Sequence, residues 1–143
     1  MELYRLIYVS AAAAPIDSHT AQQIAQVSAH RNQELGVTGI LLATKRRYLQ
    51  VLEGQAQAVN QLFRTILVDE RHTEVTLISY QRIDQPLFDA WAMKGTSLGL
   101  LGRYLGETLK KKYGEEDGDL CIPQDEHLAF ALLYDVYVFL KGG

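Results

Sequence analysis

The sequence predicts an α+β fold: a ferredoxin-like β-α-β-β-α-β-β sandwich with two additional C-terminal helices. Two observations support this prediction. Short runs rich in β-branched and aromatic residues, with the alternation typical of strands, occur between residues 3 and 94. Between these runs lie two longer segments in which apolar residues recur every three or four positions, as in amphipathic helices. In this order the two helices cover one face of a mostly antiparallel sheet.

Five short runs are predicted to be strands. Alternation in LYRLIYV puts Leu6 and Tyr8 on one face of the first. VTGILLAT and YLQVLEG are joined by a short basic turn, so they form a hairpin. EVTLISY is the fourth strand, and a fifth follows the loop QPLFDA. The predicted ranges are residues 3–9, 37–44, 48–54, 74–80 and 91–94.

The two helices of the sandwich are predicted over residues 18–35 and 57–69. Asp17 or Ser18 can cap the first helix, and Gly36 suits the left-handed residue that ends it. Residues spaced i, i+3, i+4 and i+7 form the apolar face of the second helix. They are Val59, Leu62, Phe63 and Ile66.

After Gly99 the sequence changes character. LLGRYLGETLKKKY predicts a helix interrupted by glycines, GEEDGD an acidic linker, and DEHLAFALLYDVYVFL a last helix. One side of the last helix carries Phe130, Leu133, Tyr134, Tyr137 and Leu140. We therefore divide the chain into residues 1–98 and a C-terminal helical extension, 99–143, that packs on the sheet or mediates assembly. Covering the open face of the sheet is the interpretation we favour, although the aromatic residues also suit a partner surface.

Composition excludes several classes of function. The 143 residues suffice for one domain, and 14 basic against 17 acidic residues give no electrostatic basis for binding nucleic acid. The single cysteine, Cys121, cannot form an internal disulfide, which fits a reducing compartment. No apolar run is long enough for a signal peptide or a membrane span, so we expect a cytoplasmic protein.

Polar side chains occur where apolar ones are expected. Gln50 lies between Tyr48 and Leu52 on one face of a strand, and a buried amide needs hydrogen-bond partners. On the first helix, Asn32 belongs to the face predicted to pack on the sheet. The residues of that face are Ile24, Ser28, Arg31, Asn32 and Leu35. Trp91 and Met93 are predicted to share a face of the fifth strand.

These positions predict a small-molecule site between the two helices and the sheet. Tyr8, Asn32, Gln50 and Asp69 come from four elements that meet there, and Arg71 and His72 follow Asp69 directly. The apolar walls would be Ile24, Leu52 and Ile66. A planar heterocycle with carbonyl and imide edges matches two amides that both donate and accept.

Other chemistries find no support in the sequence. The histidines, at positions 19, 30, 72 and 127, are not spaced as metal ligands. No phosphate-binding glycine motif and no arrangement of nucleophile, base and orienting residue is present. We expect neither a metal site nor an enzyme active site.

Five motifs, in this order and at these spacings, resemble the BLUF domain, the blue-light sensor that uses FAD. They are RLIYVS, RNQELGVTGILL, YLQVLEG, DERH and FDAWAMKG. The resemblance covers about residues 2 to 98, and the C-terminal helices are similar to those of the short BLUF-only, PixD-like subgroup.

The resemblance implies a flavin between the two helices, next to a photoactive switch. Tyr8 matches the tyrosine that gives an electron and a proton to the light-excited flavin, and Gln50 matches the glutamine between them. Return of the electron and proton leaves the glutamine rotated or tautomerised, with a stronger hydrogen bond to the flavin C4 carbonyl and a small red shift. Trp91 and Met93 match a pair that reorients as the signal is passed on.

The resemblance also implies the flavin contacts. Asn32 matches the residue that bonds the imide edge, and the group around Asp69 matches residues near the far side of the ring and the ribityl chain. Arg31 replaces a frequent asparagine and can still donate to a carbonyl or a phosphate. The expected contacts are Tyr8, Ile24, Ser28, Arg31, Asn32, Tyr48, Gln50, Leu52, Ile66, Asp69, Arg71, His72 and Met93. FAD is the expected flavin, with FMN or riboflavin as alternatives.

The predicted function is therefore a flavin-binding photoreceptor that is not an enzyme. A chain ending at Gly143 leaves no room for an output domain, so the signal would pass to a downstream protein or within a homo-oligomer. Two alternatives remain open. A small flavin oxidoreductase would turn over an electron donor in the dark, and a flavin-free assembly module would stay colourless with added flavin.

Tyr48 stands where the family often has phenylalanine, which suggests a second electron donor near the flavin. Tyr48→Phe should then change the quantum yield or the kinetics of the photocycle, measured by transient absorption. Unchanged kinetics would contradict a donor role for Tyr48.

Overall fold

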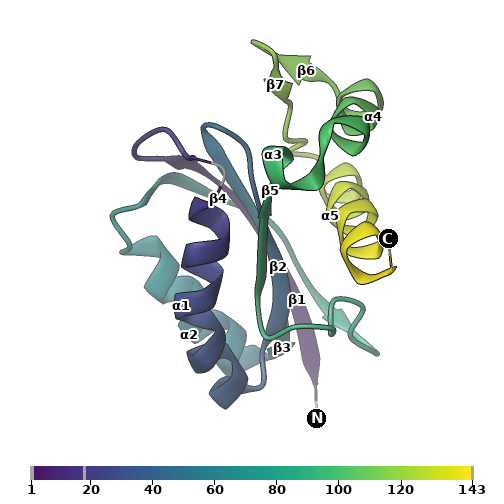
Figure 1. Ribbon diagram of the computed structural model, residues 1–143. Helices are drawn as coiled ribbons and strands as arrows, with labels where there is room; N and C mark the ends of the chain where they lie inside the picture. Colours follow the sequence, from purple (N-terminus) through teal and green to yellow (C-terminus); the bar gives the residue numbers. More distant parts are fainter. Residues whose placement is uncertain (1, 18, 143) are drawn as a thin grey trace.

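Figure 1 shows the computed structural model, in which residues 2–17 and 19–142 are described, as a twisted sheet with helices on both faces. The main sheet has the strand order β4-β1-β3-β2-β5. Its strands are Leu3–Ala12 (β1), Thr38–Ala43 (β2), Arg47–Gln55 (β3), His72–Ile83 (β4) and Lys94–Ser97 (β5). All neighbours are antiparallel except β2 and β5, which are parallel. The predicted ferredoxin-like sandwich is confirmed.

Within the described residues, five helices accompany this sheet. They are Thr20–Leu35 (α1), Ala56–Leu67 (α2), Leu98–Leu101 (α3), Arg103–Tyr113 (α4) and Glu126–Gly142 (α5). The predicted end of α1 is confirmed, because Gly36 adopts a left-handed φ of 70° and its N–H reaches the carbonyls of Asn32 and Gln33. At the other end, the Asp17 carboxylate accepts hydrogen bonds from the backbone N–H groups of His19 and Thr20. The alternative cap, Ser18, lies outside the described residues.

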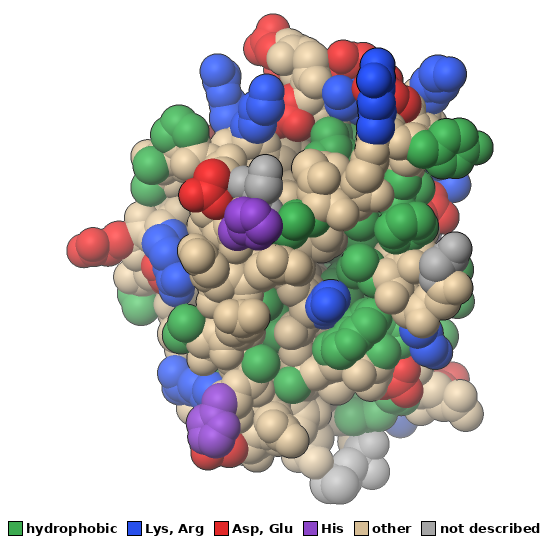
Figure 2. All heavy atoms as spheres, viewed as in Figure 1, with side chains coloured by type: hydrophobic (Ala, Val, Ile, Leu, Met, Phe, Trp, Pro, Cys, Tyr) green, Lys and Arg blue, Asp and Glu red, His purple; other side chains and the backbone are tan. Residues whose placement is uncertain are grey.

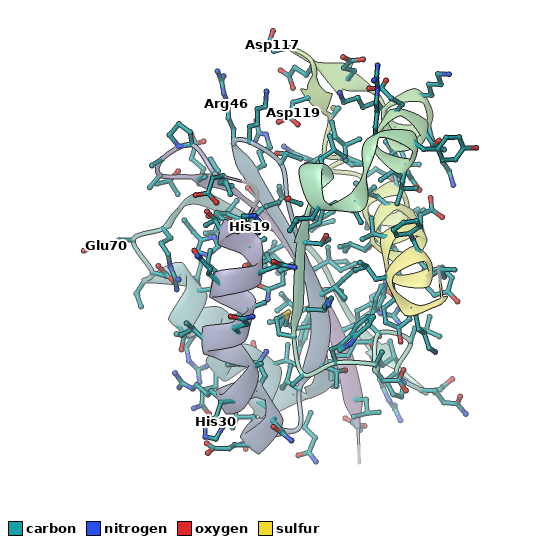
Figure 3. All side chains as sticks on the ribbon, viewed as in Figure 1. His19, His30, Arg46, Glu70, Asp117 and Asp119 are labelled. Atoms are coloured by element: carbon teal, nitrogen blue, oxygen red, sulfur yellow. The ribbon has the colours of Figure 1, made fainter. Side chains whose placement is uncertain are left out.

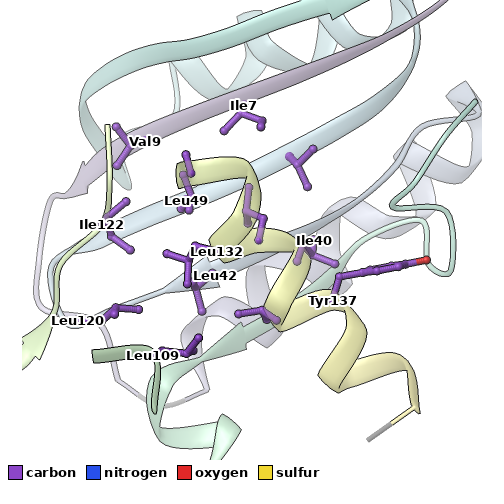
Figure 4. Close-up of a cluster of buried hydrophobic side chains, with 14 of the residues drawn as sticks. Ile7, Val9, Ile40, Leu42, Leu49, Leu109, Leu120, Ile122, Leu132 and Tyr137 are labelled. Carbon is purple, nitrogen blue, oxygen red and sulfur yellow. The ribbon is translucent and has the colours of Figure 1, made fainter. Parts of the chain in front are cut away.

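Both faces of the sheet are covered, so the strands are buried on two sides. Leu6 and Tyr8 of β1 pack under α1 and α2, whereas Ile7 and Val9 face the opposite core. Figure 4 shows this second core, where Leu132 and Tyr137 of α5 lie over the strands. The sheet separates the two cores, and a strand residue therefore faces one core while its neighbour faces the other.

Two predicted elements differ from the structure. The fifth strand begins at Lys94 and not at Trp91: the Trp91 carbonyl oxygen accepts one hydrogen bond from the Gly39 N–H of β2, but the next carbonyl, of Ala92, is bonded to the Asn32 side chain. The segment GEEDGD is not a linker but a small hairpin of Glu115–Glu116 (β6) and Asp119–Leu120 (β7). Asp117 and Gly118 both have positive φ, as a two-residue hairpin turn requires.

Close packing of α1 on β5 depends on small residues. Gly95 lies against Ala21 and Ala25 of α1, and any β-carbon added at Gly95 would collide with the Ala21 carbonyl oxygen. This contact sets how near α1 lies to the sheet, and therefore how near Asn32 lies to the segment that precedes β5.

Gly95→Ala should consequently destabilise the fold by about 3 kcal/mol, since the backbone of α1 must move to admit the methyl group. Urea unfolding followed by circular dichroism measures the change. Gly142→Ala is the matched control, because a β-carbon there meets nothing within 4 Å and should leave the stability unchanged or slightly raised. Equal stability of the two variants would contradict the packing described.

Candidate functional site

The centre of the site is a hydrogen bond between two buried side chains on neighbouring strands. Tyr8 and Gln50 are direct partners in the β1–β3 register. The Tyr8 hydroxyl donates to the Gln50 Oε1 atom at 2.5 Å, and the exposed fractions of the two residues are 0% and 6%. The period of two in both strands thus brings together the tyrosine and the glutamine that the sequence singled out.

Burial controls the protonation of Tyr8. Desolvation raises the pKa of Tyr8 well above its usual range, and the nearby Asp69 carboxylate adds to the shift. Tyr8 therefore keeps its proton at neutral pH. A protonated phenol can donate or accept; here it donates to the Gln50 carbonyl oxygen, and the Gln50 amide nitrogen points elsewhere.

That amide nitrogen reaches only a weak acceptor among the described residues. The Gln50 Nε2 atom donates to the Met93 thioether sulfur at 3.2 Å. A thioether accepts hydrogen bonds poorly, whereas a carbonyl accepts them well. The Gln50 amide therefore suits a ligand that brings a carbonyl edge to it, and an isoalloxazine ring has such an edge.

Asn32 is the second amide of the site. It is 2% exposed, and its Nδ2 atom donates to the Ala92 carbonyl oxygen at 3.1 Å. One neighbouring residue of α1 differs from the prediction. Arg31 is exposed and not on the buried face, because it lies one residue, about 100°, from Asn32 around the helix. The Ser28 hydroxyl donates to carbonyls of its own helix, at Ile24 and Ala25.

Asp69 and Arg71 lie between α2 and β4, and His72 is the first residue of β4. Arg71 donates to the Asp69 carboxylate at distances down to 2.5 Å, which lowers the pKa of Asp69 and raises that of Arg71. The His72 ring lies 4.7 Å from the Tyr48 ring and 6.1 Å from the Tyr8 ring. Burial lowers the pKa of His72, so this imidazole is neutral at pH 7.

The expected apolar walls pack in the same core as Tyr8. Leu52 is buried there, and Ile24 and Ile66 are half-buried against it. Two cavities, of about 530 and 600 Å³, lie elsewhere, beside Lys45 and the β6–β7 hairpin.

The prediction that Trp91 and Met93 share a face is wrong. Met93 is buried with Tyr8, whereas Trp91 packs against the opposite core, with its ring 5.8 Å from that of Tyr137. Both residues precede β5, in a segment without strand geometry, and alternation does not apply there. The segment thus passes from one core to the other between these two side chains.

Two residues of the site went unpredicted. Ser10 bonds to the His72 Nδ1 atom at 2.8 Å, and the Phe63 ring lies 5.7 Å from the Tyr8 ring. Ser10 follows Tyr8 by two positions on the same strand, so alternation could have indicated it. Phe63 was assigned to the apolar face of α2 without a specific partner.

Other kinds of site find no support in residues 2–17 and 19–142. No group of three or more metal-ligating side chains occurs among them, and Figure 3 shows His19 and His30 far apart at opposite ends of α1. Figure 2 shows acidic and basic side chains interspersed on the face in view. Within this described part, none of the helices is both long and apolar enough to cross a membrane.

Comparison with known proteins identifies similar chains. A family model described as "Sensors of blue-light using FAD", BLUF, matches residues 3–94. Photoactivated adenylate cyclase subunit beta of Euglena longa is 29% identical over 103 residues, which are 71% of this chain and 12% of the relative. The chain thus spans about an eighth of the length of this curated relative.

Solved structures show the same likeness. The dark-state structure of BlrB, a BLUF protein, is 30% identical with a TM-score of 0.72, covering 98% of this chain and 97% of BlrB. A bacterial light-regulated adenylyl cyclase is 32% identical with a TM-score of 0.69, covering 77% of this chain and 32% of the cyclase.

The neutral, buried His72 gives a testable pH dependence. The folded-state pKa of His72 lies below the ordinary histidine value of 6.5, so on acidification the unfolded chain takes up a proton that the folded chain does not. The stabilisation is complete above that value and is lost as the pH falls below it. His72→Gln should therefore flatten the decline of the free energy of unfolding between about pH 7 and about pH 5, measured by urea titration.

His127→Gln is the control, because the side chain of His127 is 85% exposed. This variant should follow the unmodified protein throughout the pH range. An equally steep decline in His72→Gln would show that His72 does not take part.

Proposed function

The chain belongs to the BLUF family of blue-light sensors that use FAD, and on that premise we propose that it signals by rearranging the hydrogen bonds of Gln50. The observation that carries this proposal is the buried bond from Tyr8 to Gln50, with the Gln50 amide nitrogen directed at a thioether. The signal leaves through altered contacts of the protein surface.

The bound flavin would supply the absorption of blue light and the site that accepts an electron. Tyr8 holds its proton at the hydroxyl, and the Gln50 Oε1 atom is the acceptor within reach of that proton. A proton that passes to Gln50 and back can leave the amide rotated or tautomerised. After either change, the group that Gln50 directs at the Met93 sulfur is no longer the amide NH₂ group.

Other residues would hold the flavin. Asn32 presents a buried amide on the sheet-facing side of α1, and Asp69, Arg71 and His72 offer charge and ring nitrogens at the end of α2. The full set that we propose is the one expected from the sequence: Tyr8, Ile24, Ser28, Arg31, Asn32, Tyr48, Gln50, Leu52, Ile66, Asp69, Arg71, His72 and Met93. Exposed Arg31 is suited to a phosphate, which favours FAD or FMN over riboflavin.

We assign the C-terminal part, residues 99–143, to signal output. Its last helix packs on the core face opposite Tyr8, and it also carries exposed apolar side chains at Tyr134, Val138 and Phe139. These suit contact with a second copy of the chain or with a downstream protein. The cytoplasmic location expected from the sequence stays a prediction.

The similarity to cyclases does not imply that this chain has cyclase activity. The matched segment is 12% of the Euglena longa relative, and the family model that covers it describes a sensor. The described residues therefore act, in this proposal, as a photoreceptor and not as an enzyme.

Absorption spectra before and after blue light test the proposal. Protein loaded with FAD should show a reversible small red shift, and Tyr8→Phe and Gln50→Ala should abolish it because each removes one end of the Tyr8–Gln50 bond. Tyr104→Phe, at a residue 87% exposed, should keep it.

Three outcomes would contradict the proposal. Bleaching to reduced flavin would indicate redox chemistry, and protein that stays colourless with FAD would indicate no flavin site. A red shift that survives in Tyr8→Phe would remove Tyr8 from the switch.

A further inference from the structure

A buried carboxylate lies three residues beyond Gln50 on the same strand. Glu53 is 1% exposed, and its odd spacing from Gln50 points it into the opposite core. Its Oε2 atom accepts from Arg5 at 2.7 Å, and its Oε1 atom accepts from the backbone N–H groups of Leu87 and Phe88 at 2.9 and 2.6 Å. All three partners of the Glu53 side chain are donors, and charge-assisted hydrogen bonds of this kind are strong.

The bonded amides belong to the segment between β4 and β5, residues 84–93, which carries Trp91 and Met93. Glu53 holds this segment near its start, while Gln50 touches Met93 at its end. A single strand, β3, therefore contacts the segment at two places: through Glu53 on one face of the sheet and through Gln50 on the other.

Between those two places the segment contacts α5. The Ala90 N–H donates to the Tyr137 hydroxyl at 3.2 Å, and that hydroxyl donates to the Asp89 carboxylate at 3.2 Å. The Phe88 and Trp91 rings lie 5.2 and 5.8 Å from the Tyr137 ring. Arg5 adds a second connection, because its guanidinium lies 4.9 Å from the centre of the Phe130 ring of α5.

We propose that Glu53 is a positioning residue that directs a change at Gln50 onto Tyr137 of α5. With Leu87 and Phe88 fixed, a shift of Met93 has to be taken up by residues 89–92, and within that range Asp89 and Ala90 bond to the Tyr137 hydroxyl while the Trp91 ring packs against it. Without the carboxylate, Leu87 and Phe88 could move instead, and the displacement would not reach α5. This inference rests on the photosensor function proposed above.

Two variants test it, each with a matched control. Glu53→Gln keeps the size of the side chain but loses the charge, and Tyr137→Phe removes only the hydroxyl. Glu116→Gln and Tyr104→Phe make the same changes at exposed positions. Trp91, the only tryptophan in the sequence, reports on the segment through its fluorescence.

The FAD-loaded proteins are compared in the dark and under blue light. Glu53→Gln and Tyr137→Phe should keep the flavin red shift but reduce the light-induced change in Trp91 fluorescence at least about twofold, within the range for residues that carry coupling between sites. Both controls should retain the full response. If Glu53 and Tyr137 only stabilise the fold, the two variants should have lower melting temperatures. The red shift and the Trp91 response should then be retained or lost together.

Amide hydrogen exchange gives a readout without flavin. In the flavin-free protein, Glu53→Gln should speed exchange at Leu87 and Phe88, and Glu116→Gln should not. If Glu53→Gln does not fold, Tyr137→Phe decides the question. A full Trp91 response in every folded variant would overturn the inference alone, whereas no red shift in the unmodified protein would overturn the proposed function and this inference with it.

Discussion

The structure depends on a tyrosine hydroxyl that is buried completely and still satisfied. Tyr8 has an exposed fraction of 0%, so its hydroxyl needs a partner inside the protein, and Gln50 is the acceptor that the β1–β3 register places opposite it. Burial also keeps the proton on Tyr8, and that proton is donated to the Gln50 carbonyl oxygen while the amide nitrogen is directed at Met93. A change in Tyr8 therefore acts first on Gln50.

The two cores share the strands that carry this pair. Residues of β3 alternate between them, with Gln50 and Leu52 on one face and Val51 and Glu53 on the other. The polar groups on the two faces are consequently linked through a short stretch of rigid backbone. The segment before β5 joins the same two faces by a second route, since Met93 and Trp91 lie in different cores.

Elements with a clear period were predictable from the sequence. Alternation gave the side of the sheet for Tyr8 and Gln50, and the helical period gave the buried side of α1 for Asn32 but placed Arg31 there wrongly. The segment before β5 has no period, so the separation of Trp91 from Met93 depended on contacts with residues distant in the sequence. Glu53 is a similar case, since its partners, Arg5 and the Leu87 and Phe88 amides, lie 34 to 48 positions away.

The placement of β5 affects how easily the sheet opens. This strand has four residues, lies at an edge and pairs only with β2, in parallel. A four-residue edge strand has one hydrogen-bonded neighbour, so detaching β5 breaks fewer backbone hydrogen bonds than detaching a central strand. The strand that follows Met93 directly is held by α1 as well as by the sheet, since Ala21 and Ala25 lie against Gly95. The same helix carries Asn32, so α1 contacts both β5 and the segment that precedes it.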